Sequence, residues 1–167
     1  AQARATRAHP SEEPMPSRRD MIRMTDDEVA AFIEAGKTLQ LATINKDGTP
    51  HLVAMWYGIQ DGKIVIETFE KSQKAVNLKR DPRLTCLLES GTTYDQLKGV
   101  QIQGRAKLVT KPEEIVELMK LVLGRNHEMD AKTLELAAQH GAKKRVGIVI
   151  EPEKIVSWDH TKLDVAY

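Results

Sequence analysis

Two Asp-Gly pairs constrain the fold of this chain more than any other feature of its sequence. Asp47-Gly48 and Asp61-Gly62 each separate two runs in which side chains alternate in character at every second position. Asp-Gly is favoured in the tight turns of β-hairpins, because these turns need positive φ angles that glycine adopts readily. The pattern therefore predicts three successive antiparallel strands, over residues 39–44, 51–59 and 63–68.

Further strands and helices are expected along the rest of the chain. Strand-like runs occupy residues 84–89, 100–109, 145–150 and 155–158. Gly104 suggests a bulge or a barrel bend in the longest of these runs, and Pro152 predicts an interruption between the last two. Helices are predicted over residues 26–35, from Pro112 to Gly124 and over residues 131–140, and a short basic helix opened by Ser72 is predicted before the strand that begins at Leu84.

The sum, about six strands mostly joined by hairpins, favours an α+β fold that is mainly β. A closed or partly closed antiparallel β-barrel with packed helices is the architecture that fits best. The 167 residues suit a single domain, which we expect over residues 21–167. Residues 1–20 are rich in Ala, Arg, Pro, Ser and Glu and predict a flexible tail.

Composition argues against several classes of function. A formal net charge of +1 gives no reason to expect a nucleic-acid partner. No apolar run approaches the ~20 residues of a membrane span, and no secretory signal is recognisable, so we expect a cytoplasmic protein. The histidines show no metal-ligand spacing, and no metal site is predicted. The single cysteine, Cys86, lies in an apolar run and is expected to be a buried filler.

The segment from Thr68 to Lys74 is the sharpest candidate for a binding site. It follows a strand and opens a short basic helix, so the hydroxyls of Thr68 and Ser72 and the amines of Lys71 and Lys74 meet at one helix N-terminus. Unsatisfied N–H groups and the helix dipole both favour an anion there, and a phosphate-bearing ligand is the first expectation. The alternative is a solvated basic helix, because the positive charge continues through Arg83.

Trp56 and Tyr57 are the second candidate. Two large aromatic side chains in a chain with few of them could belong to the core, or could wall a flat conjugated ring. The residues alone leave both interpretations open. The same two interpretations, core or ring wall, apply to Trp158 near the C-terminus.

Several motifs then occur in a set order: LQLATI (39–44), DGTPH (47–51), VAMWY (53–57), Thr68, KSQK (71–74), NL (77–78) and RDPR (80–83). In this order they resemble the pyridoxamine 5′-phosphate oxidase-like split β-barrel superfamily. Within it, the chain is most similar to the small actinobacterial flavin/deazaflavin oxidoreductases that use coenzyme F420. The resemblance covers about residues 25–158.

This resemblance implies an FMN-binding-like split barrel and a homodimer with two cofactor sites at the subunit interface. The phosphate would lie at the strand-to-helix turn, and the ring along the strand after Pro50. Gln103 is favoured over Gln101 on the later strand, on the ground that alternation lets only one face point inward. The cofactor-binding residues carried over are His51, Val53, Ala54, Met55, Trp56, Thr68, Lys71, Ser72, Gln73, Lys74, Asn77, Gln103 and Trp158.

The implied function is an F420H2-dependent reductase that passes a hydride to a conjugated small-molecule acceptor, with no catalytic residue predicted. The alternatives are an FMN-dependent oxidoreductase of the same fold and a non-catalytic carrier of a flavin or haem-type ligand. Many relatives carry Pro where Ala54 stands and Arg at Ser72 or Gln73, so the lysines would supply the charge. Residues 154–167 lack the arginine-rich signature of vitamin B6 oxidases, and B6 oxidation is not expected.

Overall fold

The structure is a computed structural model that describes residues 17–163. Most of the segment expected to be a tail therefore lies outside the described residues. Its last part enters a short helix, α1 (Arg18–Met21), with Ser17 as N-cap. No helix within residues 17–163 is long and apolar enough to cross a membrane.

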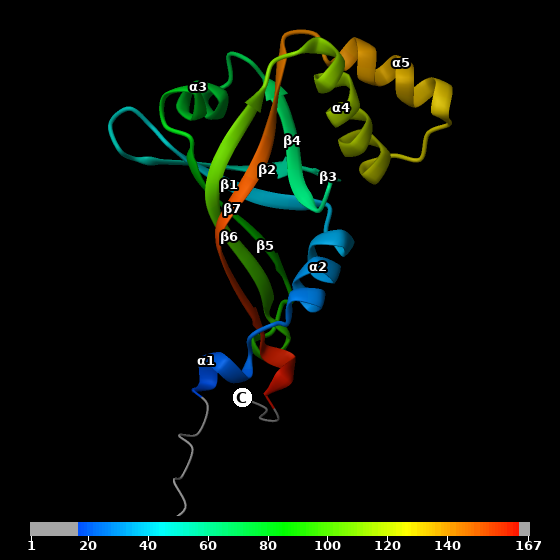
Figure 1. Ribbon diagram of the computed structural model, residues 1–167. Helices are drawn as coiled ribbons and strands as arrows, with labels where there is room; N and C mark the ends of the chain where they lie inside the picture. Colours follow the sequence, from blue (N-terminus) through cyan, green and yellow to red (C-terminus); the bar gives the residue numbers. More distant parts are fainter. Residues whose placement is uncertain (1–16, 164–167) are drawn as a thin grey trace, which may run out of the picture.

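Seven antiparallel strands form one curled sheet, in the order β2-β1-β5-β6-β7-β4-β3 (Figure 1). The fold is thus α+β and has the split-barrel form that the sequence predicts. The strands are β1 (Thr38–Ile44), β2 (Pro50–Trp56), β3 (Gly58–Gln60), β4 (Lys63–Phe69), β5 (Arg83–Ser90), β6 (Lys98–Val109) and β7 (Arg145–Asp159).

The strand predicted over residues 51–59 divides at Tyr57. The Tyr57 side chain is fully buried, and its hydroxyl donates to the Ile33 carbonyl oxygen at 2.5 Å. Before this point β2 pairs with β1, and after it β3 pairs with β4. The segment predicted as one strand therefore forms two strands, which lie at opposite ends of the strand order.

The interruption predicted at Pro152 is wrong, because β7 runs unbroken past it. Pairing between β6 and β7 shifts register at Gln103/Gly104, where Gly104 lies opposite Pro152. The strand β4 pairs with β7 only as far as Val149, so Pro152 has a single neighbouring strand. A bulge beside an unpaired edge is where a sheet tolerates proline, and Gly104 marks the expected bulge.

Helices close the ends and one side of the sheet. They are α2 (Asp26–Ala35), α3 (Gln73–Arg80), α4 (Pro112–Asn126) and α5 (Ala131–Gly141), with 3-10 turns η1 (Tyr94–Gln96) and η2 (His160–Lys162). The helix predicted over residues 26–35 is confirmed as α2, and Thr25 and Glu28 form a capping box at its start. The expected end of α4 at Gly124 is wrong: the helix continues to Asn126, and the His127 N–H bonds the Leu123 carbonyl.

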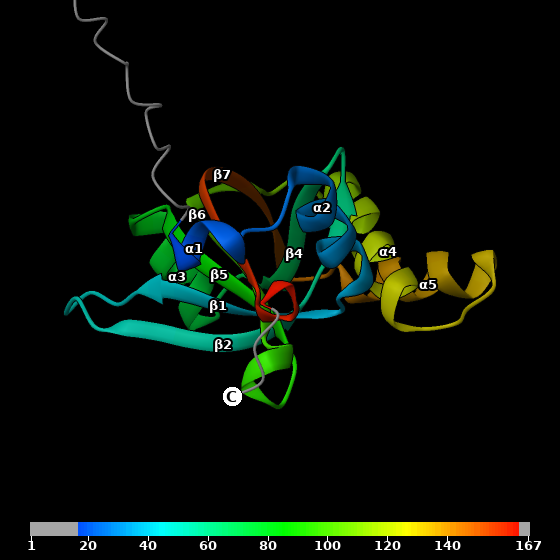
Figure 2. The ribbon, with the colours of Figure 1, turned by 90° about the horizontal axis from the view of Figure 1, so that it is seen from below.

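The core lies inside the curl of the sheet. Its fully buried side chains include Leu39, Leu41, Cys86, Val100 and Ile148. Seen from below, the β1–β2 hairpin and α3 project to one side, away from α4 and α5 on the other (Figure 2). This arrangement leaves the outer face of β1 and β2 uncovered by any helix of the described chain.

Candidate anion and ring site

The candidate site lies where β2 and β4 separate. Continuing the β3–β4 register beyond its last pair, Gly58–Val65, would place Trp56 opposite Glu67. The strands no longer pair there, because β2 has turned away to join β1. The split between them begins at the buried Tyr57, where β2 ends and β3 begins.

A cavity of ≈ 280 Å³ fills this split. Four predicted site residues line it: Ala54, Met55, Trp56 and Thr68. Thr38, Glu67 and Arg145 complete the lining and were not predicted. The structure therefore brings the two sequence candidates, the aromatic strand and the strand-to-helix turn, to one place.

The turn from β4 into α3 places hydroxyl groups beside the cavity. Ser72 is the N-cap of α3, yet its side chain makes no capping hydrogen bond. Its Oγ lies 3.2 Å from Oγ1 of Thr68, which is buried at the end of β4. Both hydroxyls can therefore turn toward a ligand at the helix N-terminus.

Charged groups of both signs meet beside this turn. The Arg145 guanidinium forms an ion pair with the Glu67 carboxylate and stacks over the Phe69 ring, 4.1 Å from its centroid. The Arg145 Nε is buried and has no hydrogen-bond partner. Burial lowers the pKa of Lys74 below its usual 10.5, while Glu67 opposes and Arg145 adds to that shift. The site thus holds two cations and one anion in partly desolvated positions.

Asn77 ties the turn to the rest of the sheet. Its side chain is fully buried on α3 and donates to Thr43 Oγ1 at 3.1 Å and to Asn45 Oδ1 at 2.9 Å. Gln73 Nε2 in turn donates to Asn77 Oδ1 at 2.9 Å. Lys71 is exposed at the outer edge of the same turn. Gln73 and Asn77 therefore support the turn rather than line the cavity.

The remaining predicted residues of β2 lie on its inner face. Register with β1 places His51 opposite Thr43 and Val53 opposite Leu41, both inward-facing. Val53 packs against the core. Ala54 and Trp56 point to the opposite face, whereas Met55 shares the inner face and reaches the cavity because it lies at the end of β2 beside the split.

Gln103 and Trp158 lie away from the cavity within one chain. Gln103 lines a separate hollow with Ala42 and Thr85 on the outer face of the sheet. Gln101 shares that face, since residues two apart on a strand point the same way, so alternation cannot choose between them. Trp158 covers Gly99 at the far end of β7, about 40 Å from Arg145 along an extended strand.

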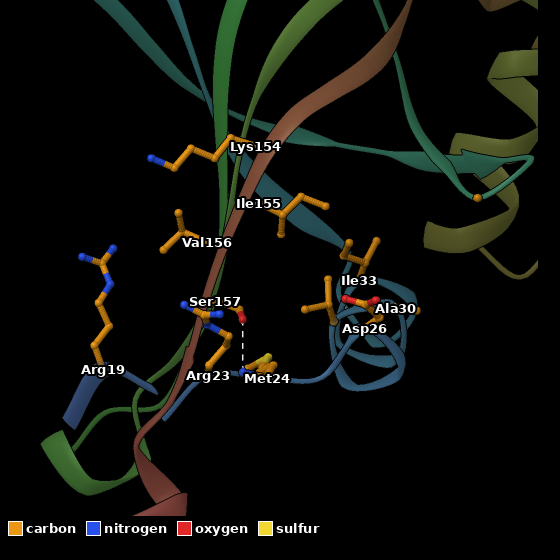
Figure 3. Close-up of a pocket in the computed structure, with 12 residues that line it drawn as sticks. Arg19, Arg23, Met24, Asp26, Ala30, Ile33, Lys154, Ile155, Val156 and Ser157 are labelled. Atoms are coloured by element: carbon orange, nitrogen blue, oxygen red, sulfur yellow. Dashed lines mark hydrogen bonds between the residues drawn. The ribbon is translucent and has the colours of Figure 1, made fainter. Parts of the chain in front are cut away.

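A larger cavity, of ≈ 820 Å³, lies beside that far part of β7 (Figure 3). Arg19, Arg23 and Lys154 line it with apolar residues of α2 and β7, including Ile33 and Ile155. The Met24 N–H donates to Ser157 Oγ at 3.1 Å and ties the entry to α2 onto β7. This cavity could not be predicted from local patterns, because its lining joins segments far apart in the chain. No group of three metal-ligating side chains occurs within residues 17–163.

Comparison with solved structures places this geometry among known proteins. A conserved hypothetical protein from Mycobacterium tuberculosis is 44% identical, covers 89% of this chain and 93% of its own, and superposes with a TM-score of 0.85. An F420 reductase is 22% identical, over 75% of this chain and 93% of its own, with a TM-score of 0.59. A heme storage protein from Vibrio cholerae is 17% identical, over 79% of this chain and 94% of its own, with a TM-score of 0.62.

The last two proteins share the fold at low identity. The sequence model described as pyridoxamine 5′-phosphate oxidase matches residues 25–159, which is most of the chain and includes every residue that lines the split between β2 and β4. The chain therefore belongs to the pyridoxamine 5′-phosphate oxidase family.

Proposed function

We propose that this protein is an oxidoreductase that uses reduced coenzyme F420 to transfer a hydride to a conjugated organic acceptor. The observation that carries the proposal is the cavity between β2 and β4, which joins a wall suited to a flat ring with a cluster suited to a phosphate. The likeness in fold to an F420 reductase supports the choice of cofactor.

The residues present fit such a cofactor. Thr68 and Ser72 offer hydroxyls, Lys74 an ammonium group, and Arg145 a guanidinium whose Nε lacks a partner. These are the donors that bind phosphate oxygens in proteins. The Arg145 guanidinium on β7 would thus serve in place of the one missing from positions 72 and 73.

The protein's own contribution is binding, orientation and exclusion of water. When bound, the reduced deazaflavin supplies the hydride. Trp56 and the backbone of Ala54 and Met55 would hold the ring, and Lys74 and Arg145 would fix the phosphate. Holding donor and acceptor in contact replaces a bimolecular encounter, and this is the main rate effect we assign to the site.

We further propose that the working protein is a homodimer with the cofactor sites at its interface. The outer face of β2 and β1 carries exposed Leu52 and Trp56, and the side-chain Oε1 of Gln40 there is buried without a partner. A second copy of this face would cover the apolar side chains. It would also bring the partner near Gln103, whose hollow includes Ala42 of β1 and Pro50 of β2.

Titration of cofactor-stripped protein with F420 and with FMN, followed by fluorescence, tests the choice of cofactor. Tight F420 binding with weak FMN binding is expected. A preference for FMN would make the protein an FMN-dependent oxidoreductase of the same fold. Binding of neither would remove the cofactor role.

A non-catalytic carrier of a haem-type ligand is the second candidate. The His127 ring packs edge-on against Trp56, 5.2 Å between centroids, and so places an imidazole near the cavity rim. The likeness in fold to a heme storage protein points the same way. Haem titration of the protein and of His127→Ala separates the two functions: a carrier would show a Soret shift that the variant loses, and no turnover with F420H2.

A further inference from the structure

The carboxylate of Glu67 is the unexpected member of the candidate phosphate site. It lines the cavity, and only 13% of its side chain is exposed, against 22% for Arg145. A site built only to attract anions would exclude a carboxylate, because like charges in a partly desolvated site repel. The position of Glu67 therefore needs a reason other than attraction of the ligand.

The charges around the cavity almost cancel. Lys74 and Arg145 contribute two positive charges and Glu67 one negative charge, and these three groups interact electrostatically with one another. Lys71 is exposed and screened by water, and Glu70 is paired with Lys79 at 3.1 Å on the surface. The partly buried charges thus leave an excess of one positive charge.

We propose that Glu67 is a specificity residue that sets the charge of the ligand, so that the site accepts a phosphodiester monoanion in preference to a phosphomonoester dianion. This inference rests on the proposed function and deepens it. A monoanion neutralises the excess charge of the site, whereas a dianion leaves one uncompensated negative charge beside Glu67. F420 carries a phosphodiester and FMN a phosphomonoester, so the same carboxylate would discriminate between the two cofactors.

The test is Glu67→Gln, which removes the charge but keeps the shape and an oxygen that can accept from Arg145. Dissociation constants are measured for F420, FMN and riboflavin at about pH 8, where a phosphomonoester carries nearly two charges. Repulsion by Glu67 scales with the charge of the phosphate group that binds beside it, so FMN should gain roughly tenfold in affinity, F420 roughly threefold, and riboflavin, which has no phosphate, nothing.

Glu151→Gln is the matched control. Glu151 also lies in a sheet ion pair, with Lys63 at 2.6 Å, but does not line the cavity. Glu151→Gln changes the net charge of the protein by the same amount as Glu67→Gln. It should leave the affinities for F420, FMN and riboflavin unchanged. Glu67→Asp, which keeps the charge, should keep the wild-type order of affinities. Thermal melts of each variant confirm that the fold is retained.

The outcomes separate this inference from the function on which it rests. Lys74→Ala should lower the affinity for FMN relative to riboflavin, and no change there would remove the phosphate site itself. If Lys74→Ala has its effect but Glu67→Gln leaves FMN unchanged, the role of Glu67 is overturned. Equal gains for FMN and riboflavin, or the same gains in Glu151→Gln, would also overturn it.

Discussion

Asn77 on α3 donates a buried hydrogen bond to Thr43 on β1, and this side chain helps to fix the candidate turn to the sheet. The two groups are 3.1 Å apart, and both side chains are essentially inaccessible to water. Asn77 also donates to Asn45, so both of its amide protons are used. The helix N-terminus is therefore held by polar contacts to the sheet in addition to the buried Ala75 and Leu78.

Asn77→Ala should destabilise the protein by about 1–3 kcal/mol, because it leaves the Thr43 hydroxyl without a partner in a buried position. Urea denaturation followed by circular dichroism measures the change. Lys79→Ala, on the exposed side of the same helix, breaks only a surface ion pair and should cost less than about 1 kcal/mol. Equal losses in the two variants would contradict the bracing role.

Cys86 should be inert toward thiol reagents in the folded protein. Its side chain is fully buried, and burial raises the pKa of the thiol to about 12, so almost no thiolate exists near neutral pH. A chromogenic disulfide reagent should react only after urea is added, with one thiol released per chain. Rapid reaction before unfolding would show that the strand β5 opens in the native state.

Lys74→Ala should weaken binding of the phosphate-bearing cofactor by about tenfold or more, with little change in stability. The ammonium group is half-buried beside the cavity, and burial already disfavours its charge in the absence of a ligand. Lys71→Ala is the matched control, since Lys71 is on the same turn but exposed, and its loss should have a smaller effect. Fluorescence titration compares them. Unchanged affinity in Lys74→Ala would remove the phosphate assignment.

Affinity for the cofactor should fall in alkaline solution, as the Lys74 ammonium group loses its proton. Burial lowers the pKa of Lys74, and a bound anion raises it again by favouring the charged amine. Binding is therefore strongest below the pKa of the free protein and weakens as pH rises through it, earlier than for an ordinary lysine. Titrations between about pH 7 and pH 10 measure this fall. In Lys74→Arg, whose guanidinium stays charged, the affinity should stay level over the same range.

Local patterns predicted most of the fold because hairpin turns and helix caps depend on neighbouring residues. Gly48 and Gly62 have φ angles of 87° and 75°, as the Asp-Gly turns require. The capping box of Thr25 formed for the same reason. The division of a predicted strand at Tyr57 and the continuity of β7 could not be predicted from neighbouring residues, because each depends on which strands pair in the sheet.

The candidate site was predictable only in part, for the same physical reason. Thr68 and Ser72 are close in the chain, and their meeting at a helix N-terminus follows from sequence. Glu67 and Arg145 meet through the pairing of β4 with β7, which joins distant segments. The sequence left open whether Trp56 and Tyr57 belong to the core or to the wall of a ring-binding site. The structure places Trp56 in the cavity and Tyr57 in the core, because neighbouring residues of a strand point to opposite faces.

Leu52→Arg should separate the proposed dimer. Leu52 is 65% exposed on the outer face of β2, and burying an arginine against a second copy of that face would leave its charge unpaired. Light scattering should give twice the chain mass of 18.7 kDa for the wild type and the single mass for the variant. Leu136→Arg is the matched control, because Leu136 is 59% exposed but lies on α5, away from this face. A wild-type monomer that binds cofactor tightly would contradict an interfacial site, and dissociation by Leu136→Arg would move the interface to α5.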